Sequence, residues 1–329
     1  MTAKKGFIAA CTAAALMALT GAARAETMAG YVSPVASQPS QARGNEIMEK
    51  LAGELGWSFR VLDANLSPDR QVSHVDTLVT LGAKAIGSWS LDPNAVAAAY
   101  TRANAAGVPV VGVNSVGPGV TLTVWWETNL CEPGGTYDRE ANWIAERKPG
   151  AKVIVMGGPP VPSIVQNTKC FEAAATAAGL EVLKQVDNTK DSTANAAAMA
   201  ADLLVRYPDV QAIWAYNDST ALGASASVIA SGKSVYSGPD SDGVMIFGMN
   251  GDDEAVDAIR EGRLTATWDP DIYAMAAAVV LGMKKLIEEP GVAHDDMIVK
   301  AQFVTRDSLD SFVPVMERGY TLDTIPMVE

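Results

Sequence analysis

The chain has 329 residues, of which 48% are hydrophobic and 19% charged, and its formal net charge at pH 7 is −13. An acidic balance of this size argues against binding to nucleic acids or anionic membrane surfaces, because both would repel the chain. The length exceeds the roughly 100 to 200 residues of one domain, so we expect two lobes.

Residues 1–25 have the pattern of a secretory signal peptide. Two lysines precede an apolar stretch over residues 7–19, and Ala23-Arg24-Ala25 supplies small residues for cleavage after Ala25. The apolar stretch is shorter than the ~20 residues that span a bilayer, and no later segment is long and apolar enough. Cys11 offers a lipoprotein site as an alternative, but too little apolar sequence precedes it. We therefore expect an exported protein.

Strand-like and helix-like segments alternate along the rest of the chain. The first half predicts strands at 29–33, 58–63, 84–88, 109–113 and 120–126, and helices at 41–55, 68–81 and 92–106. The second half predicts helices at 134–147, 162–178, 191–206, 218–231, 251–261 and 272–288, and strands at 151–156, 180–186, 210–215, 244–248, 264–268 and 297–304. Such alternation is typical of parallel sheets built from strand–helix–strand units, so the predicted fold class is α/β.

The segment IWAYNDSTALG, residues 213–223, carries the strongest local signal for a binding site. Its apolar run stops at Asn217-Asp218 and gives way to a helical stretch that Asp218 or Ser219 can cap. In open parallel α/β sheets, ligands bind beyond the carboxyl ends of strands, so we expect this junction to face a ligand. On local sequence alone, Asn217 could equally be only a helix cap or a turn residue.

Two cysteines remain after the predicted cleavage, Cys131 and Cys170. In an oxidising compartment, a disulfide between them is the leading interpretation. Two independent buried thiols are the alternative, because free cysteine packs well as a small hydrophobic residue. The spacing of the two residues fits no zinc-binding pattern.

Five segments occur in an order and spacing that are specific to one known family. They are LGWSFRVLDANLSPDRQVSHVDTLVTLGAKAI, DPNAVAAAYTRANAAGVPVV, TNLCEPGG, YPDVQAIWAYNDSTALGA and GMNGDDEAVDAIREGRLTAT. With them the chain resembles the ribose-binding type of periplasmic binding protein, the type I solute receptors of ABC importers. The resemblance implies a periplasmic receptor that has no cofactor and takes a small neutral polar ligand, a sugar, polyol or related solute, to an ABC transporter permease.

The resemblance also implies two Rossmann-like lobes that close on the ligand about a three-segment hinge. The three crossovers are expected near 126–129, 269–271 and 297–301. The implied N-terminal lobe consists of 26–127 and 271–300, and the implied C-terminal lobe of 128–270 and 301–329.

The ligand contacts that the resemblance implies come from both lobes. Those of the first lobe fall on Gln38, Ser40, Gln41, Trp89, Asn114 and Ser115. Those of the second fall on Trp126, Glu127, Gln166, Asn217, Asn250, Trp268 and Asp269. Core packing is the default for tryptophan, but Trp89, Trp126 and Trp268 lie at strand ends, where ligand contact is expected. Trp125 and Trp126 should point to opposite faces of a strand, so one of them belongs to the core.

The sequence departs from the family pattern at positions that usually carry charge. Asn114-Ser115 replaces a common Asp-Arg pair, Val165 or Gln166 stands where Arg is usual, and Asn250 replaces an Asp. Amides and indoles therefore dominate the expected pocket, which favours a neutral, hydroxyl-bearing ligand. A less polar small molecule is second, and a cation remains an alternative because Trp faces attract cations.

Enzyme motifs of the HExxH, GxSxG and GxxxxGK[ST] types do not occur in the sequence. A glycoside hydrolase that uses Glu127 and Asp269 as its carboxylate pair is the competing enzyme hypothesis. A ligand sensor that feeds a chemoreceptor or sensor kinase is the third. We expect a non-enzymatic, monomeric receptor in which Asn217→Ala weakens ligand binding and leaves stability nearly unchanged.

Overall fold

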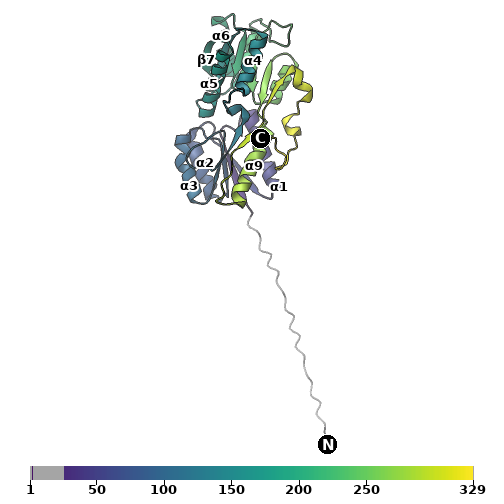
Figure 1. Cartoon of the computed structure of the whole chain (residues 1–329). Coiled ribbons are helices and arrows are strands. Elements are labelled where there is room, and N and C mark those ends of the chain that lie inside the picture. The colour runs from purple at the N-terminus through teal and green to yellow at the C-terminus, as the bar shows by residue number, and fades with distance from the viewer. Residues whose placement is uncertain (1, 3–25, 329) are drawn as a thin grey trace.

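The structure, a computed structural model, describes residue 2 and residues 26–328, which form two α/β lobes stacked end to end (Figure 1). The predicted signal peptide and its cleavage after Ala25 fall on residues that, apart from Thr2, lie outside this description. Each lobe is built around one six-stranded sheet with helices on both faces. The two-lobed α/β architecture agrees with the prediction.

The N-terminal lobe contains an entirely parallel sheet with the strand order β11-β5-β4-β3-β1-β2. Helices α1 and α9 pack together on one face, and α2 and α3 pack together on the other. The strands are β1 (Met28–Ser33), β2 (Ser58–Asp63), β3 (Ile86–Ser88), β4 (Val110–Val113), β5 (Leu122–Trp126) and β11 (Met297–Val299). The helices are α1 (Pro39–Glu54), α2 (Pro68–Thr80), α3 (Pro93–Ala105) and α9 (Ile272–Glu288).

The C-terminal lobe repeats this plan with the strand order β12-β10-β9-β8-β6-β7, in which only β12 is antiparallel to its neighbour. Helices α4 and α5 cover one face, and α6, α7 and α8 cover the other. The strands are β6 (Lys152–Gly157), β7 (Glu181–Asp187), β8 (Ala212–Ala215), β9 (Met245–Met249), β10 (Ala266–Asp269) and β12 (Gln302–Thr305). The helices are α4 (Thr136–Arg147), α5 (Pro162–Ala177), α6 (Thr193–Arg206), α7 (Asp218–Ala230) and α8 (Asp253–Arg260).

Local sequence explains where the helices begin. Helices α1, α2, α3 and α5 have proline in their first turn, where the missing N–H costs no hydrogen bond. The side chains of Ser67, Asp92, Ser192 and Asn217 accept hydrogen bonds from backbone N–H groups of the first turns of α2, α3, α6 and α7. Each of these four helices begins shortly after the carboxyl end of a strand.

Three chain segments cross between the two sheets. The first is the short 3-10 helix η1 (Glu127–Asn129), the second follows β10 at Asp269, and the third joins β11 to β12. The single strand predicted over 297–304 is therefore wrong, because this segment forms two strands that belong to different lobes. Only Lys300 and Ala301 separate them, so the two short strands resemble one strand in the sequence.

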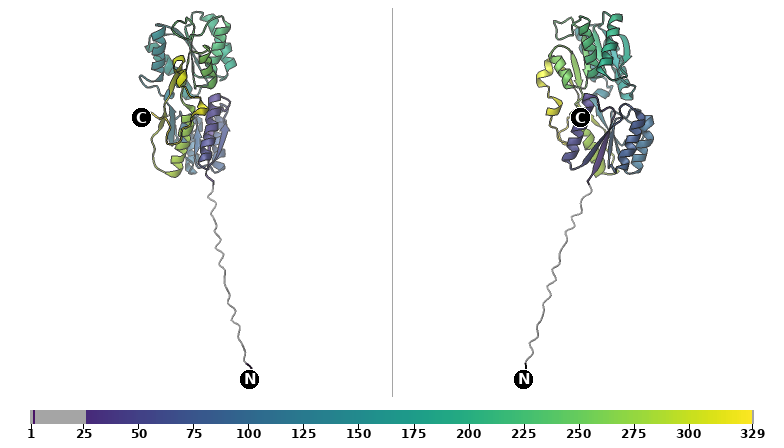
Figure 2. Two further views of the ribbon diagram at one scale, coloured as in Figure 1. Left: turned by 90° about the vertical axis from the view of Figure 1, so that its right-hand side faces the viewer. Right: turned by 180° about the vertical axis from the view of Figure 1, so that it is seen from behind.

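The last residues make a fourth connection, which differs from the predicted assignment of 301–329 to the C-terminal lobe. After η2 (Arg306–Ser311), the C-terminal tail, defined here as residues 313–328, returns to the N-terminal lobe. Val315 joins that lobe's core, and the backbone N–H of Val328 donates to the carbonyl oxygen of Ile298 in β11 at 2.8 Å. The rear view in Figure 2 shows the yellow tail on the outside of the molecule, from the upper to the lower lobe.

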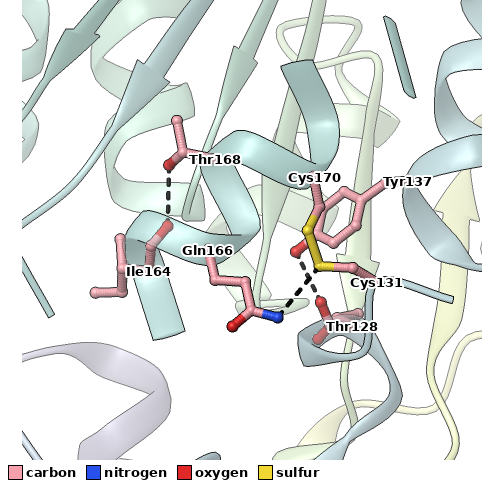
Figure 3. The surroundings of a disulfide bond; sticks show 7 residues. All are labelled: Thr128, Cys131, Tyr137, Ile164, Gln166, Thr168 and Cys170. Atoms are coloured by element: carbon pink, nitrogen blue, oxygen red, sulfur yellow. Dashed lines mark hydrogen bonds between the residues drawn. A yellow bond between two sulfur atoms is a disulfide. The ribbon is translucent and has the colours of Figure 1, made fainter. Parts of the chain in front are cut away.

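A disulfide joins Cys131 to Cys170, with 5.8 Å between their Cα atoms (Figure 3). Cys131 lies in the turn after η1, and Cys170 lies in α5. The bond therefore ties the first crossover to a helix of the C-terminal lobe. Within residues 26–328, none of the helices combines the length and the apolar character needed to cross a bilayer.

Candidate functional site

A cavity of about 80 Å³ lies between the two lobes. One buried water needs roughly 10 to 15 Å³, so this cavity has room for a small molecule. Its walls come from loops and helix starts at the carboxyl ends of strands in both lobes, as expected for parallel α/β sheets. The lining residues are Pro34, Val35, Gln38, Ser40, Gln41, Leu66, Trp89, Leu91, Trp126, Asn129, Pro159, Val161, Ile164, Asn167, Asp191, Tyr216, Asn217, Met249 and Asn250.

Seven of the residues proposed from the sequence meet at this cavity. They are Gln38, Ser40, Gln41, Trp89, Trp126, Asn217 and Asn250. They come from both lobes, and Trp126 directly precedes the first crossover, so a molecule in the cavity would contact both lobes beside the hinge.

The lobes also contact each other directly at the cavity. The Gln38 side chain donates from Nε2 to the backbone oxygen of Asp191 at 2.9 Å, and its Oε1 accepts from Ser219 Oγ at 3.3 Å. Trp89 Nε1 donates to Ser163 Oγ at 3.0 Å. Each of these bonds joins a residue of the N-terminal lobe to one of the C-terminal lobe, so the structure shows a closed arrangement.

Two indole rings form the apolar wall of the cavity. Trp89 and Trp126 pack edge to face, with 5.0 Å between ring centroids and an interplanar angle of 87°. Rings of this kind suit the apolar C–H faces of a sugar or cyclic polyol. Trp125 points away, and its Nε1 donates to Asp296 Oδ2 at 3.0 Å. Trp126 is thus the member of the pair that faces the cavity.

A polar corner lies on the C-terminal side. Asp191 Oδ1 accepts from the Tyr216 hydroxyl and from Asn217 Nδ2, the latter at 3.0 Å. Burial, followed by the neighbouring Asp191 carboxylate, raises the pKa of the Tyr216 hydroxyl, so it remains a neutral donor. Asn217 Oδ1 accepts from the backbone N–H of Thr220 at 2.9 Å. Asn217 therefore caps α7 and lines the cavity at the same time.

Three polar atoms of the lining have no hydrogen-bond partner within the described chain. They are Trp126 Nε1, Asn129 Oδ1 and Asn167 Oδ1, on side chains that are at least nine-tenths buried. A buried polar group without a partner costs ~1 to 3 kcal/mol, so these atoms would gain from hydrogen bonds to a bound molecule. Together they offer one donor, the indole N–H, and two acceptors, the amide oxygens.

Asn114 and Asn250 occupy matching places in the two lobes, but only Asn250 lines the cavity. Each follows a strand with a positive φ, 46° for Asn114 and 130° for Asn250, and each donates its backbone N–H to the next strand of its sheet. The Asn114 side chain is turned to Trp126, whose backbone N–H it accepts at 2.7 Å. Asn114 thus holds the residue that forms the aromatic wall.

Five more of the proposed residues lie outside the lining. Ser115 is bonded to the backbone of Val113 and Ser90, and Trp268 packs on Phe303 in the core. Glu127 pairs with Arg139 and accepts from the backbone N–H of Ala301 at 2.8 Å. Asp269 pairs with Arg318, and Gln166 is exposed on α5 beside Cys131. The carboxylates of the hydrolase hypothesis, Glu127 and Asp269, are thus engaged with arginines away from the cavity.

Four lining residues that the sequence did not single out complete the polar set: Asn129, Asn167, Asp191 and Tyr216. Asn167 is the neighbour of Gln166, and one residue turns a helix by about 100°, which carries Gln166 out and Asn167 in. Asp191 and Tyr216 follow strand ends, so the general rule for α/β sheets would have found them. Among residues 26–328, no cluster of three or more His, Cys, Asp and Glu side chains suits a metal ion.

Comparisons with known proteins agree with this geometry. A model of the periplasmic binding protein domain matches residues 29–290. The ribose import binding protein RbsB of Bacillus subtilis (strain 168) is 30% identical over 222 residues, which cover 67% of this chain and 68% of that protein. The D-apiose import binding protein of Paraburkholderia graminis is 26% identical over 280 residues, 81% of this chain and 83% of that protein.

The fold also matches a solved structure, the Caulobacter myo-inositol binding protein bound to myo-inositol. The TM-score is 0.77 at 22% identity, with 89% of this chain and 97% of that one covered. The matched family and these relatives are binding proteins rather than enzymes. Because the family model spans most of the chain, and the closed two-lobed fold encloses a cavity between the lobes, the chain belongs to the periplasmic binding protein family.

Proposed function

We propose that this protein captures a small neutral sugar or cyclic polyol in the periplasm and delivers it, as a monomer, to the permease of an ABC importer. The observation that carries the proposal is the cavity itself, which both lobes line with two indole rings and a set of amides. The similar proteins named above are a ribose, a D-apiose and a myo-inositol binding protein, which supports this class of ligand.

The charge at the cavity favours a neutral ligand. Asp191 is the only lining residue with an ionisable carboxyl or basic group among those described, and two neighbouring donors already engage its Oδ1. An anion would therefore meet a carboxylate and no compensating cation. Hydroxyl groups both donate and accept, so they can satisfy the amides and the indole N–H of the lining.

Closure would couple binding to transport. The ligand contacts both lobes only in the closed form, so it shifts the open and closed populations by its differential affinity for the two. The permease would then recognise the closed form, in which the two lobes present a joint surface.

A thermal-shift screen tests the proposal. The panel consists of D-ribose, D-apiose, D-allose, L-arabinose, myo-inositol and glycerol, with acetate and choline as charged controls. A ligand that binds only the folded protein raises its unfolding temperature. At a ligand concentration of one hundred times Kd, the free energy of unfolding increases by ~2.7 kcal/mol. We expect at least one sugar or polyol to raise the unfolding temperature and to bind with 1:1 stoichiometry. We expect the protein to convert none of these compounds into a product. A shift by the charged compounds alone would overturn the ligand class.

A further inference from the structure

We propose that the Cys131–Cys170 disulfide supports ligand binding. It holds in place two amides, Asn129 and Asn167, which form hydrogen bonds to adjacent hydroxyl groups of the ligand. The inference rests on the proposed function and states how one wall of the cavity is held in place.

The two cysteines lie close in sequence to the two amides. Asn129 ends η1, and Cys131 follows two residues later. Asn167 lies in α5 three residues before Cys170, a spacing that places two side chains on neighbouring parts of a helix surface. Both amides line the cavity, are buried and leave Oδ1 without a partner in the described chain. The disulfide therefore joins the two short segments that carry these amides.

On its C-terminal side, the segment around Asn129 is held chiefly by the disulfide. It is one turn of 3-10 helix, whose hydrogen bonds are weaker than those of an α-helix, and an exposed turn follows at 131–134. Three bonds hold the turn on the N-terminal side of Asn129. Glu127 pairs with Arg139 and accepts from the backbone N–H of Ala301, and the Tyr137 hydroxyl donates to the backbone oxygen of Thr128 at 2.7 Å (Figure 3). These bonds lie on residues before Asn129, and the disulfide fixes the chain after it.

The chemistry of the wall indicates what it recognises. A freely moving amide would lose conformational entropy when it binds, and the cross-link removes part of that cost in advance. Two amides and the Trp126 indole N–H, held together, match a ligand with neighbouring hydroxyl groups, because each hydroxyl can donate to one group and accept from another. Vicinal hydroxyls are therefore the feature that this wall would select.

Affinity measurements on disulfide-free protein test the inference. The probe is the tightest binder among the sugars and polyols of the screening panel, and Kd is measured by calorimetry well below the unfolding transition. The Cys131→Ser/Cys170→Ser protein is expected to bind about tenfold more weakly, the equivalent of roughly one lost hydrogen bond. Asn129→Ala and Asn167→Ala are expected to weaken binding by a similar factor. Cys131 is exposed, so reduction of the wild-type protein by a small thiol provides a second route if the serine variant does not fold.

A double-mutant cycle separates positioning from simple stabilisation. If the disulfide positions Asn167, the effect of Asn167→Ala should shrink to less than about threefold in the disulfide-free background. Asn217→Ser is the matched control, since Asn217 belongs to a different pair of elements, β8 and α7, and its effect should be the same in both backgrounds.

The outcomes are distinct. Unchanged Kd in the disulfide-free protein, with only a lower unfolding temperature, would show that the bond merely stabilises the fold and would overturn the inference alone. Failure of the oxidised wild-type protein to bind any member of the panel would overturn the proposed function and this inference with it.

Discussion

Asn217 shows how one side chain can serve structure and binding together. Its Oδ1 caps α7, while its Nδ2 donates to Asp191 at the wall of the cavity. The sequence left the cap and the ligand contact as alternatives, but the two ends of an amide can do both. The sequence-based expectation that Asn217→Ala leaves stability unchanged therefore has to be revised.

We expect Asn217→Ala to lose about 1 kcal/mol of stability, because alanine cannot cap the helix, and to bind sugar more weakly. Asn217→Ser keeps a capping oxygen and loses the donor to Asp191, so its stability should stay within about 0.5 kcal/mol of wild type while Kd rises about tenfold. Urea unfolding and calorimetry measure the two quantities. A serine variant with wild-type affinity would contradict a binding role for Asn217.

Glu140 makes stability depend on pH. Its side chain is fully buried in α4, where Oε2 accepts from Trp214 Nε1 at 3.2 Å, and burial raises its pKa from 4.5 to about 8. The folded protein therefore holds this proton more tightly than the unfolded chain does. The stability that the folded protein gains from holding this proton is complete below pH 4.5 and is lost as the pH rises through about 8.

We expect Glu140→Gln to flatten the fall in stability between pH 5 and 8 and to stabilise the protein by a few kcal/mol at the upper end, since ~1.4 kcal/mol corresponds to one pKa unit. Urea midpoints measured across this range provide the test. Burial also raises the pKa of Asp218 and Asp252, so part of the slope should remain. A variant with the full wild-type slope would show that Glu140 does not titrate in this range.

At the residue scale, the sequence could predict which loops face the ligand but not the rotation of each side chain. Gln166 was proposed as a ligand contact, but Asn167, the next residue of α5, is the one that lines the cavity. Asn114 was placed at the correct strand end, yet its amide turns to the backbone of Trp126. Such orientations depend on contacts between distant segments, which local sequence patterns do not contain.

At the scale of elements, the first turns of α5 and α7, two helices of the C-terminal lobe, form hydrogen bonds to the N-terminal lobe. Ser163 in α5 accepts from Trp89, and Ser219 in α7 donates to Gln38. Neither serine lines the cavity, although their partners Trp89 and Gln38 do, so the serines favour the closed form without contacting the ligand themselves.

Replacing both serines by alanine should weaken sugar binding roughly thirtyfold, because two lost bonds of ~1 kcal/mol each remove about 2 kcal/mol from the closed form, whereas water takes over these bonds in the open form. Small-angle scattering should also show a larger radius of gyration without ligand. Ser73→Ala is the matched control, since Ser73 Oγ donates only within its own helix, to the backbone oxygen of Asp69. Equal affinities for the double variant and the control would refute this role in closure.

Strands and helices were predictable where apolar periodicity and caps coincide, as at Ser67 and Asp92. The strand over 297–304 was the main error, because its two apolar stretches, 297–299 and 303–304, lie only three residues apart in the sequence and belong to different sheets. A pattern of period two shows which faces are buried but not in which lobe.

At the scale of the whole molecule, the C-terminal tail is bound to the hinge by a buried ionic cluster. Arg318 pairs with Asp269 at the second crossover and with Asp271, which caps α9, the latter at 2.9 Å. Burial raises the pKa of Asp269, and the Arg318 charge opposes that rise. The guanidinium therefore keeps two carboxylates satisfied at the point where the chain passes between lobes.

Arg318→Met should lower the free energy of unfolding by about 3 to 5 kcal/mol, because it leaves buried carboxylates without their partner. Arg318→Lys keeps the positive charge but cannot pair with both carboxylates as the planar guanidinium does, so it should recover only part of this loss. Denaturant unfolding at neutral pH measures both variants. If Arg318→Met were as stable as wild type, the cluster would make no net contribution.

The tail has a practical consequence for reporting ligand capture. Its last described residue, Val328, donates its backbone N–H to Ile298 beside the third crossover, so this part of the tail is anchored on the N-terminal lobe next to the hinge. A fluorescent group attached near Val328 would have a fixed position close to the pivot, and a second group on the C-terminal lobe would move relative to it as the cleft opens. Val328 is thus a suitable attachment point for an optical sensor of sugar binding.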